Sequence, residues 1–357
     1  MDPFQFAERL LVLIDQGRTT ATYKFAVLLA LTDLCLEASD KHGRPPPSVT
    51  TDQLAQRVLE YYWPQQQPYG DAGGVILRQI TGGELRIGTA IDRFRRSLPA
   101  DSRLRLDRAR SQSPEGFTRL IEDVKWVLVK MPLPRLQRLG ATVDPFIYQI
   151  EWTDEVTKAA MTRDFDNTIR FLPGAAEHLI RMSPLLRPLI QRKWADLVAG
   201  LNAACVAERR LDEFLFGTSR MSLAPLRGPL LELQDGRCFY CLSTVESRSD
   251  VDHFIPWARH PDNSIQNLVL AHAGCNRSKS DHLVAPRHVR SWRERNQRMR
   301  GPLESIAAEA TWESNAERSL AVARGTYLRL SPGTPLWSDG ENFSPADMGE
   351  LRSAVGT

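Results

Sequence analysis

The chain has 357 residues, which is enough for two or three domains, and its composition is that of an ordinary soluble globular protein. Its net charge is only +3, so binding to nucleic acid would have to come from local basic patches. The N-terminus has no basic segment before an apolar run, and the most apolar stretch, residues 25–36, is too short to span a bilayer. The five cysteines do not suggest a disulfide framework. We therefore expect a cytoplasmic protein without a membrane partner.

The first 225 residues show mainly helical patterns. Thr50 and Gln53 have the spacing of a capping box, and Ser113-Pro114 places a proline in the first turn of a helix. Helices are expected at residues 4–15, 20–39, about 50–63, 113–130, 184–204 and 208–216, and strands at 146–152 and 168–172.

Residues 86–110 form a basic cluster with eight arginines against three aspartates. Because several helices precede it, this segment could belong to a helix-turn-helix or winged-helix DNA reader. A solvated helical face explains the same charges, and charge alone does not decide between the two.

Four residues between positions 238 and 275 have the spacing of a zinc site. Cys238 and Cys241 form a CxxC pair, and His272 and Cys275 form an HxxC pair. Two such pairs complete the tetrahedral shell that zinc prefers in structural sites, and a closed shell leaves no position for chemistry. A CxxC alone could be a redox pair or two buried thiols, but the second pair favours zinc.

Polar residues of another kind lie between and after the zinc pairs. Asp252 and His253 fall within an expected strand at 251–255, Asn267 follows, and Asn276 lies where a helix should begin. Adjacent strand residues point to opposite faces, so Asp252 and His253 can share a site only at a strand end or a bulge.

This pattern resembles the HNH endonucleases, which carry a ββα-metal (His-Me) finger, in a version with zinc-binding cysteines. The residues that carry the resemblance are Asp252-His253, Asn267 and the run Cys275-Asn276-Arg277-Ser278-Lys279. The segment is also similar to the HNH domain of RNA-guided CRISPR effectors, which lack the zinc cysteines. His272 departs from the commoner cysteine at its position.

The resemblance implies metal-dependent hydrolysis of DNA. His253 would act as general base, because its pKa lies near neutrality, and Asn267 would orient it or fix the loop backbone. Asp252 and Asn276 would bind a catalytic Mg²⁺ or Mn²⁺ through oxygen. Arg277 and Lys279 would contact phosphates. Asn276 could instead cap the helix that begins there.

A second basic cluster follows the motif. Arginines at 287, 290, 293, 295, 298 and 300 lie in one helical stretch, and we expect Arg287, Arg290 and Arg293 to bind DNA phosphates. Residues 303–325 are alanine-rich and helical, and the tail from Ser331 is rich in Pro, Gly, Ser and Asp, which is typical of a loose segment.

The sequence therefore predicts a mainly α protein with small β elements: a helical N-terminal region and a C-terminal ββα-metal nuclease module. The expected division is a helical, winged-helix-like recognition domain at 1–150, a helical connection at 151–225, the nuclease module with structural Zn²⁺ at 226–300, and a helix with a loose tail at 301–357. The expected setting is bacterial restriction or phage defence, with a homodimer or a defence partner protein as further partners. A mobile-element nuclease and a zinc-containing DNA-binding protein without catalysis are the alternatives.

Overall fold

The structure, a computed structural model, describes residues 1–15, 20–70, 74–139, 142–161, 165–204, 206, 211–217, 222–245 and 248–356. It is mainly helical, with four small antiparallel sheets among these residues. The contacts divide the chain into two units. One comprises residues 1–35 and 46–220, and the other comprises residues 36–45 and 221–357. The finer division with boundaries at 150, 225 and 300 stays a prediction.

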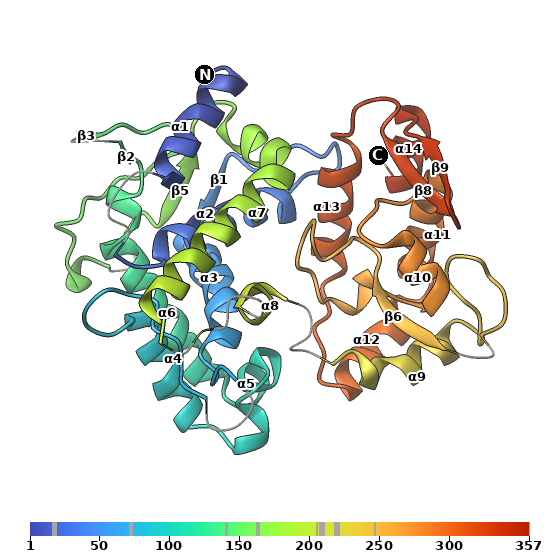
Figure 1. The fold of residues 1–357 in the computed structure, drawn as a ribbon, viewed down its shortest axis with the longest axis horizontal. Coiled ribbons are helices and arrows are strands. Elements are labelled where there is room, and N and C mark those ends of the chain that lie inside the picture. Colours follow the sequence, from blue (N-terminus) through green and yellow to red (C-terminus); the bar gives the residue numbers. More distant parts are fainter. Residues whose placement is uncertain are drawn as a thin grey trace. The chain divides into compact units, whose positions relative to one another are not determined.

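The first unit is built from helices, one three-stranded sheet and one two-stranded sheet, drawn in blue to yellow in Figure 1. Its helices are α1 (Pro3–Asp15), α2 (Tyr23–Glu37, which continues into the second unit), α3 (Thr51–Gln65), α4 (Arg86–Arg96), α5 (Leu106–Gln112), α6 (Pro114–Lys130), α7 (Ala175–Leu201) and α8 (Leu211–Phe216). Its strands are β1 (Ser48–Thr50), β2 (Arg138–Leu139), β3 (Thr142–Val143), β4 (Tyr148–Gln149) and β5 (Thr168–Phe171), and β5 lies between β1 and β4.

Local signals account for two of these helices. The Thr50 side chain accepts a hydrogen bond from Gln53 N, and the Gln53 side chain accepts one from Thr50 N, so the capping box predicted for α3 is confirmed. The α6 helix begins at Pro114 and ends at Lys130, as predicted. The prediction that a helix begins at Pro184 is wrong. Helix α7 begins at Ala175, and Pro184 lies within it.

A buried ion cluster joins three helices of the first unit. Asp33 on α2 is fully buried, and it accepts hydrogen bonds from Arg57 on α3 and from Arg187 on α7. Tyr61 also donates to Asp33. A buried carboxylate is tolerated only when it is paired in this way, so the acidic residue inside the apolar α2 is a constraint on how α2, α3 and α7 pack.

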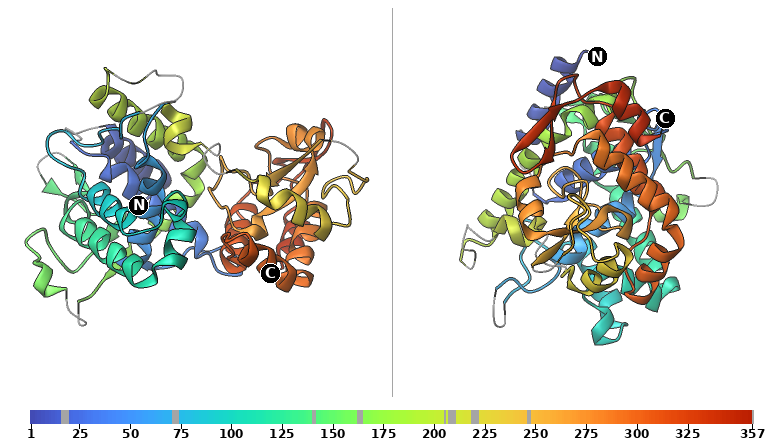
Figure 2. Two further views of the ribbon diagram at one scale, coloured as in Figure 1. Left: turned by 90° about the horizontal axis from the view of Figure 1, so that it is seen from below. Right: turned by 90° about the vertical axis from the view of Figure 1, so that its right-hand side faces the viewer.

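The second unit contains the region with the zinc spacing (Figure 1; Figure 2 shows it from two further sides). Its elements are α9 (Ala224–Leu233), β6 (Ser249–His253), the 3-10 turn η6 (Ile265–Asn267), β7 (Leu268–His272), α10 (Ala273–Lys279), α11 (Pro286–Arg298), α12 (Arg300–Glu309), α13 (Ala316–Tyr327), β8 (Pro335–Asp339), β9 (Asn342–Pro345) and α14 (Met348–Val355).

The prediction of a loose tail from Ser331 is wrong. Strands β8 and β9 form an antiparallel hairpin, and α14 follows them. Trp337 on β8 is buried, and Leu351 and Val355 on α14 are buried as well. Pro332, Gly333 and Gly340 lie in turns of this segment, while its few large apolar residues anchor it to the rest of the unit.

The described helices include none that combines the length and the apolar character of a transmembrane segment. Cys35 is buried, and Cys205 lies outside the described residues.

Candidate nuclease and metal site

The site is organised by a β-hairpin and the helix that follows it. Strands β6 and β7 pair antiparallel, with Asp252 opposite Val269 and His253 opposite Leu268. Helix α10 begins directly after β7 and contacts both strands. Sequence positions 249–279 therefore form a ββα unit, and the 254–264 loop closes its hairpin.

Apolar packing holds this ββα unit in place from both sides. Buried side chains of α9, β7 and α12 form one cluster that includes Leu226, Leu270 and Leu303. On α11, the Trp292 ring stacks on Phe254, with ring centroids 4.9 Å apart and an interplanar angle of 2°. The hairpin that carries the polar residues is therefore rigidly supported.

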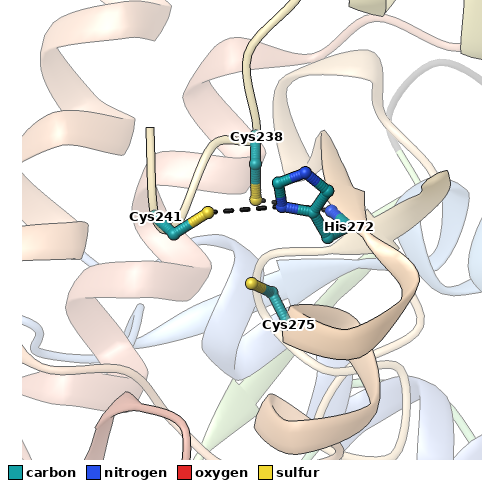
Figure 3. A group of neighbouring side chains, drawn as sticks. All are labelled: Cys238, Cys241, His272 and Cys275. Carbon is teal, nitrogen blue, oxygen red and sulfur yellow. Dashed lines mark hydrogen bonds between the residues drawn. The ribbon is translucent and has the colours of Figure 1, made fainter. Parts of the chain in front are cut away.

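The four predicted zinc ligands come together (Figure 3). The ligand atoms of Cys238, Cys241, His272 and Cys275 all lie within 4.8 Å of one another. Cys238 and Cys241 come from the turn after α9, His272 ends β7, and Cys275 lies on α10. A set of three sulfurs and one imidazole at this separation is a tetrahedral zinc donor set.

The hydrogen bonds of His272 support its role as a ligand. Its Nε2 lies 3.1 Å from the carbonyl oxygen of Thr244, which can only accept, so Nε2 carries the proton. Its Nδ1 therefore has a free lone pair, and it faces Cys241 Sγ at 3.3 Å. A backbone carbonyl that fixes the tautomer in this way is the usual outer partner of a metal-binding histidine.

The electrostatics of the three cysteine thiols also favour a cation bound between them. Burial, together with the neighbouring thiols of Cys238 and Cys241, raises the pKa of Cys275 to about 12. Several thiolates cannot share so small a volume unless a positive charge lies between them. The donor set therefore fits Zn²⁺, which would hold all three sulfurs as thiolates.

His253 lies at the end of β6 with a defined hydrogen-bond partner. Its Nε2 is 2.8 Å from Oδ1 of Asn263, an acceptor, so Nε2 carries the proton in this arrangement. Nδ1 is not bonded by any described residue and keeps contact with solvent. Burial lowers the pKa of His253 below its ordinary value, which favours the neutral imidazole that a base requires.

Asn263 was not foreseen from the sequence, which pointed to Asn267. Asn267 is fully buried and bonds the backbone instead: its Oδ1 accepts from Ile255 N, and its Nδ2 donates to the carbonyls of Ile255 and Asp262. The amide of Asn267 thus bonds the loop backbone, and the role proposed for it toward His253 stays a prediction. The backbone carbonyl of Asn263 is held by Trp312 Nε1 at 2.7 Å.

Asp252 faces α10, on the other side of β6 from His253. Its Oδ2 accepts a hydrogen bond from the Tyr240 hydroxyl at 2.6 Å and from Lys279 Nζ at 3.0 Å. None of the described groups bonds its Oδ1. This oxygen is also not one of the fully buried atoms that lack a hydrogen-bond partner, so it keeps contact with solvent. One oxygen of this carboxylate is thus available to a ligand.

Asn276 does not cap α10, because the N-cap position is His272 and Asn276 lies within the helix. The capping role considered for it is therefore wrong. Its Nδ2 donates to Asp250 Oδ2 at 3.2 Å, which leaves its side-chain oxygen free to bind. Asp250 was overlooked, although the two-residue period of β6 places it on the same face as Asp252.

The residues expected to contact phosphates are in different situations. Arg277 and Arg290 are exposed. Arg287 pairs with Asp339 at 2.6 Å, and Arg293 is half-buried and donates to the carbonyl of Ser353. Lys279 is fully buried: besides Asp252, its Nζ contacts the carbonyl of His253 at 2.9 Å, so in this conformation it braces the site and cannot reach a phosphate.

Comparison with known families agrees with this geometry. Residues 238–285, from Cys238 to beyond α10, match the family model of the HNH endonucleases. The chain thus carries an HNH endonuclease domain, which implies nuclease activity and DNA binding in general. A search of curated proteins found no match, and a search of solved structures found none either.

A second family model covers the larger part of the chain. Residues 5–213 match the family described as "Domain of unknown function (DUF8808)". Because this match spans more than half of the 357 residues, the chain belongs to that family. The matched region corresponds to the first structural unit and includes the basic segment at α4 and α5.

Proposed function

We propose that the protein is a metal-dependent endonuclease that hydrolyses phosphodiester bonds of DNA, with His253 as its general base. The observation that carries this proposal is the pairing of His253 Nε2 with Asn263, because it leaves the Nδ1 lone pair facing solvent on a neutral imidazole. Nδ1 would take a proton from the water that attacks phosphorus, and the bond from phosphorus to the leaving oxygen would break.

Asp252 and Asn276 are the proposed ligands of a catalytic Mg²⁺ or Mn²⁺. Both offer a side-chain oxygen that the described residues leave unbonded, and hard divalent ions prefer such oxygens. When bound, the ion would stabilise negative charge on the phosphate and the leaving oxygen. Asp250, which bonds Asn276, would orient that amide or supply a further oxygen. Zn²⁺ at Cys238, Cys241, His272 and Cys275 would be structural.

DNA contacts are proposed at two places. Near the site, Arg277 and Arg290 are exposed, and no carboxylate partner is described for either. In the first unit, Arg86 and Arg96 on α4 are exposed, and so is Arg110 on α5. The whole segment 86–110 has a net charge of +5, from eight arginines and three aspartates, while the entire chain has only +3. This concentration of charge supports a recognition role for the N-terminal region.

The proposed setting is restriction or phage defence in the cytoplasm. It is supported by the joining of a nuclease module to a larger separate unit, which could recognise a substrate or a partner protein. A single finger of this type cuts one strand, so a break in both strands would need a homodimer or two successive cuts.

A nicking assay tests the proposal. Supercoiled plasmid is incubated with the purified chain and Mg²⁺ or Mn²⁺, and the conversion to open circles is followed on gels. His253→Ala should abolish nicking while DNA binding and zinc content stay at wild-type levels, because His253 bonds neither zinc nor phosphate in this arrangement. Wild-type nicking by His253→Ala would refute the assignment of the base, and absence of nicking by the wild type under all metals would favour the DNA-binding alternative.

A further inference from the structure

Tyr240 connects the zinc knuckle to the site proposed for the catalytic metal. It lies between the two cysteines of the Cys238–Cys241 pair, next to Phe239. Its hydroxyl donates to Asp252 Oδ2 at 2.6 Å, and both side chains are buried. The knuckle and the carboxylate are thus joined by one direct hydrogen bond.

The Tyr240 ring is held firmly by its surroundings. It packs edge-to-face on Trp337 of β8 at a centroid distance of 5.2 Å and on His288 of α11 at 5.5 Å. Its neighbour Phe239 ties the knuckle backbone to β7 through a hydrogen bond from Phe239 N to the carbonyl of Leu270. A hydroxyl on such a rigid support has a fixed position relative to the hairpin.

The hydroxyl stays a donor at neutral pH. A carboxylate oxygen accepts and does not donate, so the phenol must donate in the 2.6 Å hydrogen bond to Asp252 Oδ2. Together with Lys279 Nζ at 3.0 Å, the hydroxyl occupies Oδ2 and restricts the rotation of the carboxylate. Asp252 therefore presents its other oxygen, Oδ1, in one orientation.

We propose that Tyr240 is a positioning residue through which the zinc knuckle orients Asp252 toward the catalytic metal ion. The inference rests on the proposed function, because it takes Asp252 as a ligand of that ion. In this arrangement zinc would do more than stabilise the module, because Cys238 and Cys241, which would bind it, flank the tyrosine that orients the carboxylate. An outer hydrogen bond of this kind commonly changes metal affinity or activity by about 10- to 100-fold.

The test uses the full chain with Tyr240→Phe, which removes one oxygen and keeps the ring packing. The first readout is the Mg²⁺ concentration that gives half-maximal nicking, and we expect it to rise about tenfold. The second does not depend on activity. Binding of Mn²⁺ is measured by electron paramagnetic resonance in the His253→Ala background with uncut DNA present, and adding Tyr240→Phe should weaken it by a similar factor. Zinc content should equal that of the wild type.

Tyr327→Phe is the matched control. Tyr327 is also fully buried in the same unit, and its hydroxyl accepts a hydrogen bond from Val284 N without bonding Asp252. This variant should lower thermal stability to a similar degree but leave the Mg²⁺ requirement unchanged. A merely structural role for the Tyr240 hydroxyl would make the two variants behave alike.

The outcomes separate this inference from the proposed function. If Asp252→Ala retains the wild-type metal requirement, Asp252 is not a ligand and the proposed metal site is wrong. If Asp252→Ala abolishes nicking while Tyr240→Phe keeps wild-type Mg²⁺ and Mn²⁺ binding, the inference is overturned and the proposed function stands. A Tyr240→Phe chain that misfolds or loses its zinc would also overturn it, because the hydroxyl would then support the knuckle itself.

Discussion

Replacing Asn263 with alanine should slow nicking by about 5- to 30-fold at saturating metal and DNA, for reasons that follow from the charge of His253. In the resting site, Asn263 Oδ1 lies 2.8 Å from Nε2 of a neutral imidazole. When His253 accepts a proton from the attacking water, the same hydrogen bond becomes charge-assisted. The bond is therefore stronger in the transition state than in the ground state, which is the condition for an effect on kcat.

The size of the effect follows from the difference between the two kinds of bond. A hydrogen bond between neutral groups contributes about 0.5–1.5 kcal/mol, and one to a charged group contributes about 1.5–3 kcal/mol. A difference of about 1–2 kcal/mol corresponds to about 5- to 30-fold in rate. Release of the ring from its tautomer could only add to this loss.

Single-turnover nicking of supercoiled plasmid measures the chemical step for the wild type and for Asn263→Ala. Asn263→Asp keeps an oxygen acceptor at Nε2, so it should retain more activity than Asn263→Ala. Asn342→Ala serves as the control. Asn342 is exposed in the β8–β9 hairpin, and its described side-chain hydrogen bond is to Asp339. Wild-type nicking by Asn263→Ala, beside an inactive His253→Ala, would refute this explanation of how the base is held.

Three further predictions concern zinc, DNA contacts and pH. Purified wild-type chain should contain about one zinc per molecule, and Cys238→Ser should lower both the zinc content and the melting temperature of the module; elemental analysis that finds no zinc in untreated folded protein would contradict the site. Replacing Arg277 and Arg290 together should weaken binding to all DNA sequences and lower the slope of log K against log salt concentration by the equivalent of about two phosphate contacts. Arg300→Ala should change this slope less, because the guanidinium of Arg300 already pairs with Glu304. An unaltered slope in the double variant would remove both arginines from the interface. Acid should destabilise the second unit through Asp262: burial alone would raise the pKa of this carboxyl, but the charge of Arg318 at 2.8 Å and the hydroxyl of Ser319 lower it overall. Its stabilisation is therefore present above the unfolded pKa of about 3.9 and lost as the pH falls through the lower folded value. Asp262→Asn should be less stable than the wild type at neutral pH and should lose less stability between pH 5 and pH 2 in denaturant titrations; an equal loss would show that other groups govern acid unfolding.

The sequence by itself determined the local features of the protein. The α3 capping box and the start of α6 at Pro114 depend on residues within a few positions of one another, so short-range patterns were sufficient. The four members of the cluster that could hold a metal ion were also found in this way, because CxxC and HxxC spacing is a property of two short segments. The HNH-like residues around Asp252 and His253 carried the nuclease assignment for the same reason.

Only the tertiary structure decided the partners of those residues. Asn263 is ten positions from His253, and Tyr240 is twelve positions from Asp252, so no local rule places either pair in contact. Lys279 has the sequence context of a phosphate contact, yet α10 packs so that its ammonium group is buried against Asp252.

The same reason explains the remaining errors. Asn276 lies inside α10 because the helix begins directly at the end of β7, and the C-terminal segment is ordered because Trp337 and α14 find buried positions in the unit. Composition and spacing describe what a segment can do alone. Whether a side chain becomes a ligand, a brace or a surface charge depends on which distant surfaces pack against it, and that is set by the burial of apolar area across the whole unit.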